Sequence, residues 1–165
     1  MKTLYLIRHA IAEEQCADYP NDAARPLTDE GTERFRLQVK GLRTLDVAPE
    51  VILTSPLLRC RQTAQLLADG LEGDIPLVVS EVLRPGAHPA DVLEGLGAHR
   101  RTGAIALVGH EPSMGHLAST LIGATGPIPF KKGSVCRIDV DAFPPRGAGV
   151  LIWMLPPRAL RLLGE

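Results

Sequence analysis

The chain has few aromatic residues and no excess of charge of either sign. Aromatic side chains make up 4% of its 165 residues, which leaves no platform on which the bases of single-stranded nucleic acid could stack. The formal net charge is -1 at pH 7, so the overall charge favours neither nucleic acid nor an anionic membrane. We therefore expect no nucleic-acid partner, and any anion-binding surface must be local.

Cysteines and long hydrophobic runs are also scarce. The three cysteines, Cys16, Cys60 and Cys136, are odd in number and widely spaced, which fits neither a disulfide framework nor a zinc knuckle. No apolar run approaches the length of a membrane span, and the first residues do not have the pattern of a signal peptide. These absences predict a cytoplasmic protein with reduced thiols and no membrane partner.

Short apolar segments alternate with amphipathic segments along the whole chain. The apolar segments predict strands at residues 2–7, 51–53, 76–79, 104–108, 134–140 and 149–155, and apolar residues at helical spacing predict helices over 29–45, 56–70, from 89 onward and over 112–122. The alternation predicts one α/β domain over residues 1–165. We expect a three-layer α/β/α sandwich whose mostly parallel central sheet has about six strands, one of them an antiparallel edge strand.

Helix boundaries are marked by a few polar and proline residues. Thr28 is a predicted N-cap, and Ser55 is predicted to cap the second helix with Pro56 at the first helical position. Pro156 and Pro157 are predicted to end the last strand.

Three junctions between strand and helix carry side chains that suit a phosphoryl group. Arg8 and His9 follow the first strand, Arg59 follows the second, and His110 follows the fourth. The carboxyl ends of parallel strands meet at one edge of a sheet, where such folds bind ligands. Two guanidinium groups can grip a phosphoryl group, one imidazole can attack phosphorus, and the other can donate a hydrogen bond to it. We therefore predict that these four residues are catalytic and bind phosphate.

Three segments resemble the signature motifs of the histidine phosphatase superfamily, also called the phosphoglycerate mutase-like superfamily. They are Leu6–Ala10, Ser55–Ala64 and Val108–Pro112. Their order and spacing match over nearly the entire chain. The resemblance implies that His9 is the nucleophile of a cofactor-independent enzyme and that the other three residues form its phosphate pocket.

Shorter segments are similar to the small phosphohistidine phosphatases of that superfamily, the SixA type. They are Arg25–Thr28, Leu83–Gly86 and Trp153–Pro156. This resemblance implies a phosphatase that removes phosphate from phosphohistidine on a protein, such as a phosphorelay component. The alternatives are a small-molecule phosphomonoesterase or mutase of the same superfamily, and a non-catalytic module that binds phosphate or a phosphoprotein.

Members that cleave phosphate monoesters often carry a carboxylate after the third strand as the general acid. Glu81 is the candidate proton donor at this place, although its position close to the strand end leaves the role open. A phosphohistidine substrate has less need of an acid, because its leaving group is a neutral imidazole whose conjugate acid has a pKa of about 6.5.

Other polar residues are candidates for the rim of the pocket or for a metal site. Arg25, Ser55 and His88 are the candidate rim residues, since each lies in or beside a loop at the predicted ligand edge. His110 and His116 are six positions apart with a helix start between them, which is not a ligand spacing. We predict no metal site and no cofactor.

Overall fold

The central sheet has six strands in the order β3-β2-β4-β1-β5-β6. The computed structural model describes all 165 residues. Its strands are β1 (Lys2–Arg8), β2 (Val51–Thr54), β3 (Leu77–Val79), β4 (Ala104–Gly109), β5 (Val135–Val140) and β6 (Val150–Leu155). The pairs β1–β4, β2–β4 and β2–β3 are parallel, whereas β5 is antiparallel to both β1 and β6. The carboxyl ends of β1, β2 and β4 therefore meet at one edge of the sheet.

The predicted mostly parallel α/β sandwich is confirmed, with one correction. The antiparallel strand is predicted at the edge of the sheet, but β5 lies between β1 and β6. The reason is the short connection after β5, which folds β6 back as a hairpin partner on its outer side. The edge strand β6 thus runs in the same direction as the parallel strands.

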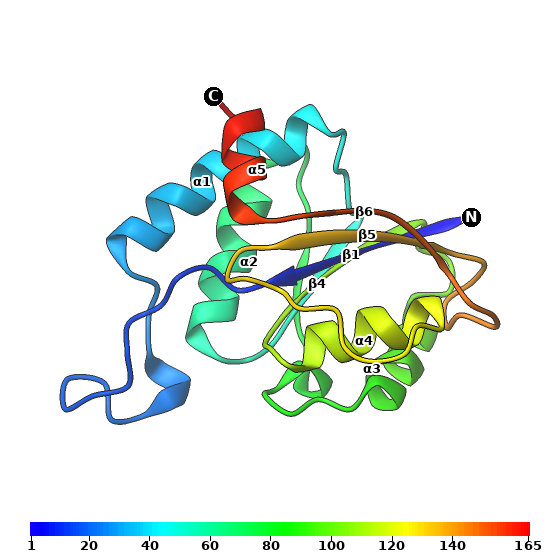
Figure 1. Cartoon of the computed structure of the whole chain (residues 1–165), viewed down its shortest axis with the longest axis horizontal. Helices are drawn as coiled ribbons and strands as arrows, with labels where there is room; N and C mark the ends of the chain where they lie inside the picture. The colour runs from blue at the N-terminus through cyan, green and yellow to red at the C-terminus, as the bar shows by residue number, and fades with distance from the viewer.

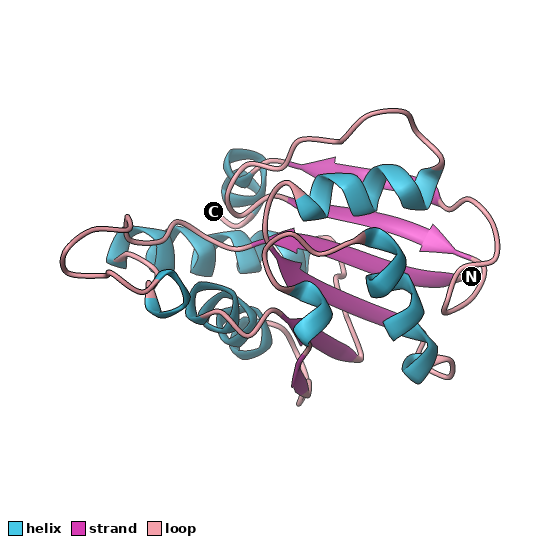
Figure 2. Cartoon of the chain, turned by 90° about the horizontal axis from the view of Figure 1, so that it is seen from below, coloured by secondary structure: helices cyan, strands magenta, loops and turns pink.

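Helices cover both faces of the sheet (Figures 1 and 2). The α-helices are α1 (Asp29–Thr44), α2 (Leu58–Gly70), α3 (Pro89–Gly95), α4 (Ser113–Ile122) and α5 (Pro157–Leu163), and short 3-10 helices are η1 (Asp22–Ala24), η2 (Glu81–Leu83) and η3 (Leu96–His99). Helices α1, α2 and α5 lie on one face, and α3 and α4 lie on the other. None of the helices combines the length and the apolar character needed to cross a bilayer.

Alternation along β1 divides the core into two layers. Leu4 and Leu6 pack into the layer under α3 and α4, whereas Tyr5 and Ile7 pack into the layer under α1, α2 and α5. Successive side chains of a strand point to opposite faces, so β1 is buried from both sides. The Arg8-His9 pair that follows it is thereby held on a rigid element.

Two predicted helix starts have different outcomes. Thr28 caps α1 as predicted, because its Oγ1 accepts a hydrogen bond from the Gly31 amide at 2.8 Å. The prediction for Ser55 is wrong, since α2 begins at Leu58 and has no side-chain cap. The Ser55 hydroxyl instead lies 2.8 Å from Nε2 of His110.

Helix α5 is absent from the sequence-based prediction. Pro157 occupies its first turn, a position that proline tolerates because the amide there has no partner within the helix. Leu160 is fully buried against α1. At Gly41 of α1 a Cβ atom would lie 2.0 Å from the Leu160 carbonyl oxygen, so glycine permits the close approach of the two helices.

Candidate active site

The structure brings the four predicted catalytic residues together at the carboxyl edge of the sheet. They line a cavity of about 270 Å³, which we call the catalytic cavity. Its lining residues are Arg8, His9, Ala12, Glu14, Arg25, Arg59, Pro85, His110, Glu111 and Lys132. Four of these are cationic and two are acidic, so the cavity suits an anion.

His9 is held as a neutral imidazole. Its Nδ1 lies 2.7 Å from the carbonyl oxygen of Ala10, which can only accept, so Nδ1 carries the proton and the lone pair is on Nε2. Burial lowers the pKa of His9 to about 3; the Ala10 carbonyl opposes this shift, and the charges of His110, Arg59 and Arg8 add to it. A neutral imidazole with an available lone pair is a nucleophile.

His110 lies beside His9, with the two ring centroids 5.4 Å apart. The Ser55 hydroxyl accepts a hydrogen bond from the Leu57 amide at 3.3 Å and lies 2.8 Å from Nε2 of His110. The Cys60 sulfur lies 3.4 Å from the same nitrogen. Burial is the main cause that lowers the pKa of His110 to about 4, so this ring is also neutral at pH 7.

The two arginines are anchored to different segments of the chain. Nη1 of Arg8 donates to the carbonyl oxygen of Phe130 at 2.8 Å, while Nη1 and Nη2 of Arg59 reach the backbone and the carboxylate of Asp22 at 2.9 and 3.2 Å. Burial lowers the pKa of Arg8, although it stays charged at pH 7. The Nε–H groups of both arginines are buried without a partner in the protein. A tetrahedral oxyanion would supply acceptors for them.

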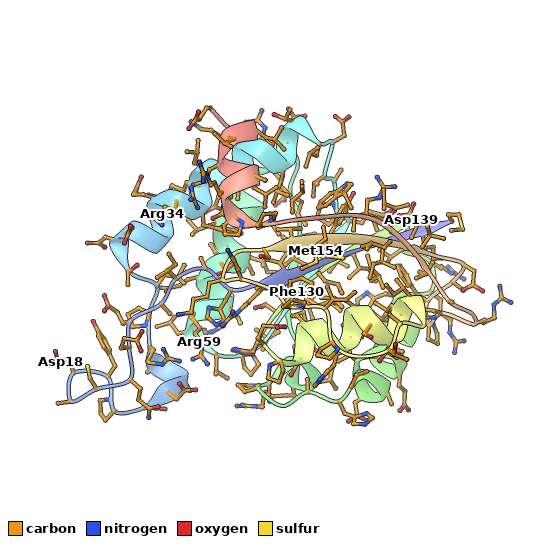
Figure 3. All side chains as sticks on the ribbon, viewed as in Figure 1. Asp18, Arg34, Arg59, Phe130, Asp139 and Met154 are labelled. Atoms are coloured by element: carbon orange, nitrogen blue, oxygen red, sulfur yellow. The ribbon has the colours of Figure 1, made fainter.

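Arg25, a predicted rim residue, lines the catalytic cavity and shares the Asp22 carboxylate with Arg59. The Asp22 carboxylate pairs with Arg25 at 2.8 Å and with Arg59 at 3.2 Å. Partial burial acts to raise the pKa of Asp22, but hydrogen bonding from Arg25 and the charge of Arg59 outweigh it and lower the pKa. Figure 3 shows the connection after β1 projecting from the sheet, with Asp18 at its far end and Arg59 near its base.

The structure does not bring the predicted residues Glu81 and His88 to the catalytic cavity. Glu81 begins η2 and is exposed, paired with Arg84 one turn later. His88 caps α3, where its Nδ1 accepts a hydrogen bond from the Ala90 amide at 3.2 Å. Both side chains are held by partners close in the sequence, which turns them away from the site. Ser55, the third rim candidate, is fully buried behind His110.

Three charged lining residues were not predicted, namely Glu14, Glu111 and Lys132. Glu111 accepts hydrogen bonds from the Gly115 amide at 2.7 Å and from the Phe130 amide at 3.2 Å, so it supports the segment that anchors Arg8. The structure has no group of three or more side chains arranged to hold a metal ion.

Lys132 reaches the cavity because its loop is tied to the end of β1. The amide of Gly133 donates to the carbonyl oxygens of Arg8 and His9 at 3.1 and 3.0 Å. No sequence signal near Lys132 indicates this long-range contact.

Similar proteins place the chain in a family. The sequence model of the histidine phosphatase superfamily (branch 1) matches residues 4–85. The chain is 41% identical over 126 residues to an uncharacterized protein of Picosynechococcus sp., which covers 74% of this chain and 75% of that protein. It is 27% identical over 161 residues to the phosphohistidine phosphatase SixA of Escherichia coli, with 96% of each chain covered.

Solved structures agree with these relatives. The protein histidine phosphatase SixA in complex with tungstate has a TM-score of 0.85 and 26% identity, and the match covers 96% of this chain and 99% of that one. The alpha-ribazole phosphatase of Shigella flexneri has a TM-score of 0.64 at 20% identity over 90% of this chain and 98% of that one, which shows a shared fold. The chain belongs to the histidine phosphatase superfamily, in its SixA branch.

Proposed function

We propose that the protein is a phosphatase that removes phosphate from phosphohistidine on a protein, through a covalent intermediate on His9. The observation that carries the proposal is the neutral His9 ring, whose proton is fixed on Nδ1 in a cavity that also holds two arginines. An imidazole of ordinary pKa would be partly protonated at pH 7 and would lose nucleophilicity.

In the first step, the lone pair on Nε2 of His9 attacks phosphorus while the phosphorus–nitrogen bond of the substrate breaks. The substrate ring, protonated on its other nitrogen, leaves as neutral imidazole. The positive charge that develops on His9 is stabilised by the Nδ1–H bond to the Ala10 carbonyl. Arg8 and Arg59 stabilise the negative charge on the phosphoryl oxygens.

His110 donates to a phosphoryl oxygen in this scheme. Because the Ser55 oxygen already accepts from the Leu57 amide, its own proton can point to Nε2 of His110, 2.8 Å away. The neutral His110 ring then carries its proton on Nδ1, which is the donor available to the substrate. Ser55 is thus a positioning residue.

In the second step, a water molecule attacks the phosphorus of phospho-His9. The bond between phosphorus and Nε2 breaks, and His9 leaves as the neutral imidazole with which the cycle began. The proton lost by water ends on the phosphate product. Neither step requires a metal or a cofactor to balance.

The arrangement of carboxylates supports phosphohistidine as the substrate. No carboxylate from the segment directly after β3 lines the catalytic cavity. Glu111, which follows β4, does line it, but both of its oxygens already accept hydrogen bonds from backbone amides. A neutral imidazole leaves without a strong acid, whereas an alkoxide does not. The names of the SixA relatives point to the same substrate, and tungstate in the SixA complex is a tetrahedral oxyanion like phosphate.

One observation favours a phosphomonoesterase as the second candidate. Glu14 lines the catalytic cavity and is exposed, so it can meet a leaving oxygen. In that case Glu14, rather than Glu81, would be the proton donor.

The test compares kcat/KM for a phosphohistidine peptide with kcat/KM for a sugar phosphate, whose leaving group is an alkoxide, in the wild type and in the variants H9A, E14Q and H88A. The proposal expects a preference for phosphohistidine that H9A abolishes. H88A is the matched control, because it removes a histidine outside the catalytic cavity, and it should keep wild-type rates. A preference for the sugar phosphate that E14Q abolishes would establish the monoesterase instead. Equal rates in H9A and the wild type would indicate a binding module.

We also infer a cytoplasmic location and a single domain over residues 1–165. All three cysteines are unpaired, as suits a reducing compartment. Fractionation of cells that express the protein at natural levels would test the location.

A further inference from the structure

A second cavity of about 320 Å³ lies beside the catalytic cavity, between α1, α5 and the loop that precedes β5. Its lining contains five cationic side chains and no carboxylate. We call this cavity the basic groove, and the cationic residues are Arg34, Lys131, Lys132, Arg158 and Arg161. They come from three separate parts of the sequence, so only the fold collects them.

The basic groove continues from the catalytic cavity. Lys132 lines both, and Ala10, which lines the groove, directly follows His9 in the chain. Figure 3 shows Arg34 on α1, at the same end of the molecule as Arg59. A chain segment that presents a phosphorylated side chain to His9 can therefore continue into the groove.

The groove is built on fixed elements rather than on free loops. The buried amide of Gln38 on α1 donates to the carbonyl oxygen of Gly133 at 2.8 Å, which ties Lys131 and Lys132 to α1. Gly133 has a φ of +85°, and a Cβ atom there would lie 2.8 Å from the Gln38 side chain. Glycine is required both by this conformation and by the close contact.

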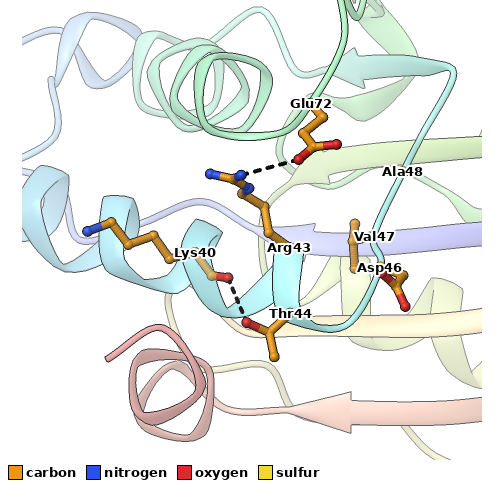
Figure 4. A pocket seen from close by; sticks show the side chains of 7 residues that line it. All are labelled: Lys40, Arg43, Thr44, Asp46, Val47, Ala48 and Glu72. Carbon is orange, nitrogen blue, oxygen red and sulfur yellow. Dashed lines mark hydrogen bonds and ion pairs between the residues drawn. The ribbon is translucent and has the colours of Figure 1, made fainter.

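Most of the positive charge in the groove is not neutralised within the protein. Arg34 pairs with Glu30 at 2.5 Å, whereas the other four cations have no carboxylate within 4.0 Å. The cavity in Figure 4 is different, because there Arg43 pairs with Glu72 at 3.3 Å and Asp46 lies in the lining. Since the whole chain has a net charge of -1, the positive groove is a local feature.

We propose that the basic groove binds an acidic segment of the phosphorylated protein substrate, next to its phosphohistidine. The proposal rests on the function proposed above and adds what selects the substrate. Exposed charges of this kind act on encounter and on KM rather than on the chemical step. Salt should weaken the effect, because exposed charges are screened over about 8 Å at physiological ionic strength.

The experiment uses two phosphohistidine peptides of equal length, in which the phosphohistidine is flanked by glutamates or by glutamines. A double variant, R158E/R161E, reverses two charges of the groove, and R100E/R101E is the matched control. Arg100 and Arg101 are exposed and precede β4, at the opposite end of the sheet. Free phosphohistidine serves as the substrate without flanking residues.

We expect the wild type and the control to prefer the acidic peptide in kcat/KM by about tenfold at low salt, which is the effect of two ion pairs at the protein surface. R158E/R161E should lose this preference through KM, with kcat and the rate on free phosphohistidine unchanged. Equal kcat/KM for the two peptides in the wild type, or an equal loss of the preference in both double variants, would refute the proposed role of the basic groove. Neither result would refute the proposed phosphatase activity.

Direct binding separates the groove from the activity. Fluorescence anisotropy with labelled peptides of the same flanking sequences, which carry histidine in place of phosphohistidine, measures Kd without turnover. We expect the acidic peptide to bind more tightly to the wild type and to R100E/R101E than to R158E/R161E. If binding shows that order and no phosphohistidine is hydrolysed in the kinetic assay, the proposed function fails while the anion-binding role of the basic groove stands. If phosphatidylserine vesicles bind more tightly than the acidic peptide, the groove binds an anionic membrane and the proposed protein partner is refuted.

Discussion

Lowering the pH from 7 to 5 should leave the His9 and His110 rings neutral. Burial sets their pKa values at about 3 and about 4, against about 6.5 for an exposed imidazole. For a histidine nucleophile of ordinary pKa, the neutral fraction would fall about 25-fold over this range. The neutral fraction of His9 should hardly change. NMR titration of the ring nitrogens measures both pKa values without a substrate, and H9A and H110A assign the signals. A pKa near 6.5 for His9 would refute the argument that burial keeps it ready to attack.

The same shifts predict how the stability changes with pH. A histidine whose pKa is lowered in the folded state binds fewer protons there than in the unfolded state, so the free energy of unfolding falls as the pH drops from about 6.5 toward 3. At pH 5 the loss is about 2 kcal/mol for each of the two rings. Urea denaturation should show that the free energy of unfolding differs less between pH 7 and pH 5 in H110Q than in the wild type. An unchanged difference would contradict the assigned pKa of His110.

Three substitutions test the supports of the site and the core. Asp22→Asn keeps an acceptor for Arg59 but removes the charge that partly neutralises it, so inorganic phosphate should inhibit about two- to fivefold more tightly at low salt; unchanged inhibition would contradict this. Ser55→Ala removes the hydrogen bond that orients His110 and should lower kcat up to about tenfold with little change in KM or Tm; a loss confined to Tm would make Ser55 merely structural. Phe35→Ala deletes a fully buried ring and should cost about 3 to 5 kcal/mol in urea unfolding, and a loss below about 1 kcal/mol would refute its place in the core.

Local pattern was enough to predict most of the sheet. The segment of β4 is almost entirely apolar, as is typical of a parallel strand covered on both faces, and Thr28 marks the start of α1. Helix α5 was not predicted because two prolines follow the end of β6. Proline can end a strand, but it can also occupy the first turn of a helix. Its packing against Gly41 depends on a contact far away in the sequence.

The catalytic cavity was predictable as far as strand ends determine it. Arg8, His9 and His110 each lie at or directly after a strand, so the topology alone brings them together. Asp22 and Lys132 are placed by tertiary contacts, with Arg59 in one case and through the loop tied to β1 in the other. No spacing in the sequence encodes such contacts.

Two predicted site residues that lie outside the catalytic cavity, Glu81 and His88, do so for the same reason. Glu81 and His88 lie in the right region of the chain, but each side chain has a local partner within three residues. The direction of each side chain depends on the exact start of a short helix. The sequence pattern predicts a turn in this region but not that start. For this reason the sequence places Glu81 and His88 near the site without fixing whether their side chains reach it.

The most direct test of the central claim is whether His9 becomes phosphorylated during turnover. Rapid quenching into alkali, which preserves phosphohistidine, followed by intact-protein and peptide mass spectrometry would measure this. We expect one phosphoryl group on the wild type, located at His9, that decays as inorganic phosphate appears and is absent from H9A. Turnover of phosphohistidine with no phosphoryl group on His9, or with undiminished rate in H9A, would contradict the account.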